Sequence, residues 1–225
     1  MRADVRRILF TFGSLLACGS AMASPVTINA SASGWYADSG FHTSNNPNYA
    51  VGFDGASLYN DFFTFDLSSL SGPISSATLR LSTFLVSSAF PSETVSFFDV
   101  FTSIPVLTAD QVRPDIYSDL GSGTLFGSRT YFPADSFQVR DVALNAAAIA
   151  AINAAAGGGF AIGGSIVTLN GQGVEEFVFG NSGQFVQQLI VEAEAVPVPE
   201  PSSLFLLGTG LLAGVRRWRR RQQTA

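Results

Sequence analysis

The sequence predicts an all-β protein: an antiparallel, jelly-roll-like β-sandwich with one short helix. Residues 24–195 contain a turn signal about every ten residues, with Gly, Ser, Asn and Pro between runs rich in Val, Thr, Phe and Tyr. Short runs separated in this way are typical of β-sandwiches and barrels. A parallel α/β sheet would need a helix between successive strands, and only one helix is convincing here.

Nine segments are candidate strands. The clearest pattern lies within 78–86, where Leu79 and Leu81 share one face of the strand while Arg80 and Ser82 share the other. In chain order the nine are Val26–Ser31, Asp61–Asp66, Ala77–Val86, Val95–Phe101, Gly123–Tyr131, Phe137–Leu144, Gly159–Thr168, Glu175–Phe179 and Gln187–Ala195.

The one predicted helix spans 145–156. Asn145 is a suitable N-cap, Ile149 and Ile152 share a face, and the three glycines at 157–159 end the helix. We expect this helix to close one end of the sandwich and to serve structure rather than cofactor binding.

Residues 1–23 have the three parts of a secretory signal peptide, with Arg2, Arg6 and Arg7 ahead of an apolar stretch too short to span a bilayer. Signal peptidase is expected to recognise the small residues Ala21 and Ala23 and to leave Ser24 first. The only cysteine allows an alternative, because 15–18 resembles a lipobox that would make Cys18 a lipidated N-terminus.

Charge also separates the ends of the chain from its body. The chain has no Lys, and residues 24–200 hold 16 acidic residues against 4 Arg, a net charge of about −12. Such a domain repels phosphate backbones, so the sequence predicts no nucleic-acid partner. With signal-peptide cleavage the mature chain has no cysteine, so its stability does not depend on disulfides.

Residues 196–225 have a proline-rich start, an apolar segment over 202–215 and an Arg-rich end. Fourteen residues of helix measure roughly 21 Å, against ~30 Å for the hydrocarbon core of a bilayer. This favours transient membrane association over a lasting anchor, although permanent anchoring is an alternative. The cytoplasmic stop would be Arg216, Arg217, Arg219, Arg220 and Arg221.

This C-terminal arrangement resembles the PEP-CTERM sorting signal carried by exosortase substrates of Gram-negative bacteria, many of which make exopolysaccharide and biofilm matrix. The resemblance implies that Pro199, Glu200 and Pro201 are the recognition element and that the tail is removed after export. It further implies an exported protein, held at the inner membrane during sorting and then placed on the cell surface or released.

A second resemblance concerns the body of the chain. Residues 62–70 with 74–81, and later 144–153 with 160–164, resemble sequence patterns of secreted bacterial β-sandwich modules. This resemblance implies the fold. Such modules are often compared with carbohydrate-binding domains, and their ligand is generally unassigned.

The best candidate for ligand binding is the stretch 34–49, read as a long loop. Trp35, Tyr36 and Tyr49 supply aromatic rings, and His42 and several side-chain amides supply hydrogen bonds, a mixture that suits sugars. The alternative is that the aromatic residues hold the loop against the edge of the sandwich.

Other chemistry has weaker support in the sequence. His42 is the only histidine and no nucleophile elbow accompanies it, so we predict no catalytic residues. We expect no cofactor or metal, with calcium as a weak possibility at Asp54, Asn60, Asp61 and Asp66. The sequence thus predicts a non-enzymatic surface or matrix protein, structural or exopolysaccharide-associated. The alternative is a secreted hydrolase of exopolysaccharide.

Overall fold

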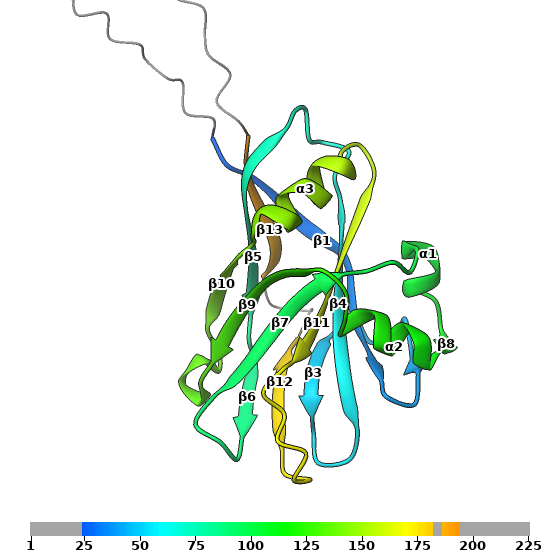
Figure 1. The fold of residues 1–225 in the computed structure, drawn as a ribbon, viewed down its shortest axis with the longest axis vertical. Helices are drawn as coiled ribbons and strands as arrows, with labels where there is room; N and C mark the ends of the chain where they lie inside the picture. Colours follow the sequence, from blue (N-terminus) through cyan, green and yellow to red (C-terminus); the bar gives the residue numbers. More distant parts are fainter. Residues whose placement is uncertain (1–23, 182–185, 194–225) are drawn as a thin grey trace, which may run out of the picture. The chain divides into compact units, whose positions relative to one another are not determined.

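The computed structural model describes residues 24–181 and 186–193, which form an antiparallel β-sandwich (Figure 1). The all-β expectation is therefore confirmed. The strands are β1 (Val26–Ala37), β2 (Phe41–His42), β3 (Tyr49–Phe53), β4 (Leu58–Asp66), β5 (Ile74–Ser82), β6 (Leu85–Ser88), β7 (Glu93–Asp99), β8 (Gln111–Val112), β9 (Leu125–Tyr131), β10 (Val139–Ala143), β11 (Gly159–Ile166), β12 (Glu176–Gly180) and β13 (Gln187–Ala193).

Strands β1 and β4 join the two layers of the sandwich. The first part of β1 pairs with β13, and after a bulge near Ala30 its second part pairs with β4. On its other side, β4 pairs with β3 at its first two residues and with β11 from Asp61 onward. From β4, one branch therefore runs β11-β7-β9 and the other runs β3-β12-β6, while β13, β5 and β10 follow one another from the first part of β1.

Large apolar side chains fill the space between the layers. Phe63 and Phe65 on β4, Leu79 on β5 and Phe97 on β7 are all at most 1% exposed and belong to one buried cluster. Burying each such side chain stabilises the fold by about 1.5–3 kcal/mol. Alternation along the strands thus builds the main core.

A second, smaller buried cluster lies on the opposite face of β1 and β4. Two helices cover it: α1 (Ile104–Leu107) and α2 (Pro114–Leu120). Gly163 on β11 allows α2 to lie close, because a Cβ there would stand 2.6 Å from the carbonyl oxygen of Leu120. The cluster consists of Tyr36, Phe62, Leu107, Ile116 and Leu120.

The expectation of a single helix is therefore wrong. Helices α1 and α2 have four and seven residues, too few to show the 3.6-residue periodicity on which the prediction depended. Each carries a proline in its first turn, and a short 3-10 helix, η1 (Pro133–Asp135), also begins at a proline.

The helix expected over 145–156 is present as α3 (Ala146–Ala154). Asn145 caps it, its side-chain oxygen accepting hydrogen bonds from the backbone N–H of Ala147 and Ala148. Asn153 ties the helix to β5 through two hydrogen bonds with the backbone of Ile74. In Figure 1, α3 lies at the end of the domain where β1 begins and β13 ends.

Each of the nine predicted strand segments contains a strand, and the differences lie mainly at the ends. The segment 77–86 spans two strands, because Thr83 and Phe84 leave the ladder and bond to Gln138 and Phe179 instead. The sequence analysis did not predict β2, β3 or β8, and it ended β1 six residues too early, at Ser31 rather than Ala37.

Asp61 is a carboxyl side chain inside the main core. It is 1% exposed, and neither carboxyl oxygen has a hydrogen-bond partner among residues 24–181 and 186–193. Gly164 lies opposite it on β11 and makes room for it, because a Cβ there would stand 2.2 Å from Oδ1 of Asp61. Burial raises the pKa of Asp61 well above its usual value, so the neutral acid is favoured in the folded protein.

We expect the Asp61→Asn variant to gain stability relative to the wild type as pH rises. Below the unfolded pKa, Asp61 is neutral in both states. Above it, the unfolded chain loses the proton first, so wild-type stability falls by up to about 1.4 kcal/mol per pH unit until the folded pKa is reached. Urea denaturation of both proteins between pH 4 and pH 8 measures the widening difference.

Asp66→Asn is the matched control, on the same strand but exposed, with its pKa lowered by hydrogen bonds from Ser68. The difference in free energy of unfolding between Asp66→Asn and the wild type should not widen in the same direction as pH rises. If the difference in free energy of unfolding between Asp61→Asn and the wild type stays constant from pH 4 to pH 8, Asp61 has the same pKa in the folded and unfolded states.

Candidate functional site

The segment 34–49 is not one long loop, because it contains the end of β1, the whole of β2 and the first residue of β3, joined by turns. Because side chains alternate along β1, Trp35 and Tyr36 face opposite sides of the sheet. Tyr36, His42 and Tyr49 are 0%, 3% and 2% exposed, while Trp35 is partly exposed. Burial places these three side chains away from the surface, whereas Trp35 is open to solvent in part, and ligand contact at this segment stays a prediction.

Tyr36 and His42 hold this segment in place instead. Their rings stack with centroids 4.6 Å apart, and the Tyr36 hydroxyl donates a hydrogen bond of 2.8 Å to the carbonyl of Leu107 on α1. His42 Nδ1 donates to the carbonyl of Trp35 at 2.9 Å. Burial lowers the pKa of His42, so the neutral imidazole is favoured. These contacts are those of core residues.

Seven aromatic side chains form a continuous chain of ring contacts, which we call the aromatic row. The row starts at Phe41, whose ring contacts the ring of Trp35. Consecutive ring centroids lie 5.0–6.1 Å apart, a distance typical of direct ring contact. All seven rings are at least partly exposed, and Phe137 reaches 65%. In order the row is Phe41, Trp35, Tyr59, Phe177, Phe179, Phe84 and Phe137.

Strand β3 crosses the middle of the row without adding a side chain to it. Gly52 lies directly opposite Tyr59 on β4 and Phe177 on β12. Its φ is +102°, and a Cβ would stand 2.0 Å from the carbonyl oxygen of Glu176, so glycine is required. Its neighbour Val51 points into the main core, which places Tyr59 and Phe177 on the outer face.

The far end of the row is held in an uncommon backbone conformation. Phe137 has a φ of 59°, in the left-handed region that bulky residues rarely adopt. Its ring meets Phe84 edge to face at 5.0 Å, and the adjacent Gln138 accepts a hydrogen bond from the backbone N–H of Thr83. Such a conformation persists only where its surroundings fix it.

The residues considered for calcium lie in separate surroundings. Asp54 accepts hydrogen bonds from the backbone of its own turn, and Asp66 does the same at the end of β4. Asn60 donates to a carbonyl of α2, whereas Asp61 faces the main core. Within residues 24–181 and 186–193, no group of three His, Cys, Asp or Glu side chains is placed to hold a metal ion.

The predicted signal peptide, with Ala21 and Ala23, and the C-terminal segment lie outside the described residues; Ser24 is the first described residue and is exposed. A family model for the PEP-CTERM protein-sorting motif matches residues 197–221. The chain carries a PEP-CTERM sorting motif. No curated protein matches the sequence. The motif implies an exported protein that is held at the membrane, processed by an exosortase and then displayed on the cell surface.

The PEP-CTERM match includes Pro199, Glu200 and Pro201 and the arginines at 216–221. The apolar segment expected to associate with the membrane, 202–215, falls inside the same match. In the part of the chain that the structure describes, no helix has the length and apolar character needed to cross a membrane.

We expect Glu200→Ala to block removal of the PEP-CTERM tail, because the change deletes the charged residue between the two prolines. In cells with a functioning exosortase, intact-mass measurement of the exported protein should then show Arg216–Arg221 retained in the variant and lost from the wild type. Glu192→Ala, an exposed position on β13 before the motif, is the control and should be processed normally. A wild-type surface form that keeps its arginines would contradict tail removal.

Proposed function

We propose that this protein is a non-enzymatic component of the cell surface or extracellular matrix that binds exopolysaccharide through the aromatic row. The continuity of the row is the observation that carries the proposal. It runs across β1, β4, β3 and β12 to Phe84, which precedes β6 and whose backbone N–H donates to the carbonyl of Phe179. Strands about 4.8 Å apart make such a row on the order of 20 Å long. Contiguous exposed apolar surface on a soluble domain marks an interaction site.

A sugar ring suits this surface because it has an apolar C–H face and a polar rim. Aromatic side chains offer a large, rigid apolar face at low cost in conformational entropy, and Tyr59 adds a hydroxyl group. A repeating polymer would meet several rings at once, so individually weak contacts add up through multivalency.

The position of the row supports the same function. Strands β3, β6 and β12 lie at the end of the domain opposite the start of β1 and the end of β13, where the terminal segments attach (Figure 1). The surface that carries most of the row is therefore remote from both points of attachment. Export through the sorting pathway would bring it to the compartment where exopolysaccharide accumulates.

A secreted hydrolase would need two carboxyl groups facing a substrate cleft. Glu93 and Glu176 are 0% and 1% exposed, and each carboxylate accepts hydrogen bonds from protein groups. Ser88 and Thr168 donate to Glu93, and Asn170 donates to Glu176. Protein hydrogen bonds therefore occupy both of these buried glutamates.

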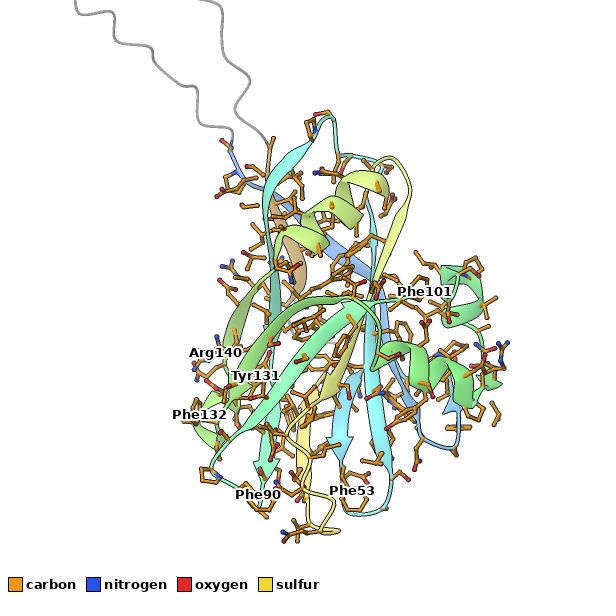
Figure 2. The ribbon with its side chains drawn as sticks, viewed as in Figure 1. Phe53, Phe90, Phe101, Tyr131, Phe132 and Arg140 are labelled. Atoms are coloured by element: carbon orange, nitrogen blue, oxygen red, sulfur yellow. The ribbon has the colours of Figure 1, made fainter. Side chains whose placement is uncertain are left out.

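Replacing Trp35 and Phe177 together by alanine should weaken polysaccharide binding at least tenfold, because stacking on an aromatic ring contributes about 1–3 kcal/mol. Affinity electrophoresis through gels that contain the polymer measures the change. Phe101→Ala is the matched control: Phe101 is 80% exposed but lies between β7 and α1, off the row (Figure 2). Equal migration of the wild type and the double variant with every polymer would end the proposal.

A further inference from the structure

Acidic side chains lie beside the Tyr59 part of the aromatic row. The side chains of Asp54 and Ser57 hydrogen bond with Tyr59; burial raises the pKa of Tyr59, and the nearby carboxylates of Asp54 and Asp38 raise it further. Glu175 is exposed and lies two residues before Phe177. Its backbone carbonyl accepts a hydrogen bond from the N–H of Ala89, and this bond continues the pairing of β6 with β12. An extended backbone at this spacing places Glu175 and Phe177 on the same face.

Basic residues are engaged elsewhere in the described part of the chain. Arg80 pairs with Asp141 at 2.7 Å, and the ion pairs of Arg113 and Arg140 are made with Asp115 and Asp135. Arg129 lies 5.5 Å over the ring of Tyr131 and donates to the carbonyl of Asp141. The full sequence has no Lys. The carboxylates beside the row therefore have no protein cation among these residues.

A cavity adjoins the same part of the row. Its volume is about 240 Å³, and it is lined by Ser57 and Leu58, the two residues before Tyr59, and by Asp38. The rest of the lining is mostly apolar, and Phe53, one of its members, lies at the end of the domain opposite α3 (Figure 2). Buried Glu176 also lines it. The cavity thus has apolar walls and two acidic residues.

We infer that the polysaccharide bound by the aromatic row carries free amino groups. Sugar rings would stack on Trp35, Tyr59 and Phe177, and ammonium groups along the polymer would pair with Asp38, Asp54 and Glu175. The described residues hold 14 acidic residues against 4 Arg, so a polymer of uronic acids would be repelled while a cationic polymer is attracted. The inference rests on the proposed function and adds the charge class of the ligand.

The test compares two oligomers that differ only in their amino groups: a β-1,4-linked glucosamine hexamer and its fully N-acetylated counterpart. Calorimetric titration is run at mildly acidic pH, where the amines are protonated. Burial opposes ionisation of Asp54, but hydrogen bonds from Ser57 and Ala56 hold its pKa below the usual value, so it stays ionised there. We expect the glucosamine hexamer to bind at least fivefold more tightly at low salt, with the preference shrinking as salt rises.

The variant Asp38→Asn, Asp54→Asn, Glu175→Gln should lose this preference and keep its affinity for the N-acetylated hexamer. The matched control Asp66→Asn, Asp115→Asn, Glu192→Gln changes the net charge equally at exposed sites not associated with the row and should keep the preference. Equal or tighter binding of the N-acetylated hexamer by the wild type would overturn the charge inference and leave carbohydrate binding intact. Binding of neither hexamer, nor of any polymer, would overturn both.

Discussion

The antiparallel pairing of β1 with β4 is the contact on which the rest of the structure depends. Both layers of the sandwich start from this pair, because β4 bonds to β3 at one end and to β11 along the remainder. Where the layers diverge, one face of β4 changes from outer surface at Tyr59 to main core at Asp61 and Phe63. The β1–β4 pair therefore carries part of the aromatic row at one end and contributes side chains to the main core at the other.

Glycines let the backbone accommodate this branching. Gly52 keeps β3 close enough to β12 for Tyr59 and Phe177 to meet across it, with ring centroids 6.0 Å apart. Gly163 and Gly164 are neighbours on β11 and face opposite sides: the first admits α2, and the second admits the carboxyl of Asp61. A methyl group at any of these positions would push apart elements that the fold brings together.

Local patterns in the sequence could predict most strands and α3, because alternation, the Asn145 cap and the three glycines after the helix are visible within a few residues. No pattern within a few residues reveals the positive φ of Gly52 or the short helix α1. The row depends on register: Trp35, Tyr59 and Phe177 are far apart in the chain and meet only through pairings that the sequence does not reveal. The sequence also could not distinguish Trp35 from Tyr36: both were predicted as binding residues because they are aromatic, yet Tyr36 is buried.

The scarcity of cations shapes the interior and the surface alike. Inside, neutral donors hold two buried glutamates: Ser88 and Thr168 donate to Glu93, and Asn170 donates to Glu176. Asp61 has no hydrogen-bond partner in the part of the chain that the structure describes. A buried carboxylate without a counter-ion is costly unless it is well hydrogen-bonded or protonated. On the surface, water can solvate the carboxylates beside the row, so they persist there without ion pairs. A chain of this composition therefore needs neutral hydrogen-bond donors or protonation for the acids in its interior, and it keeps a negatively charged surface beside the row.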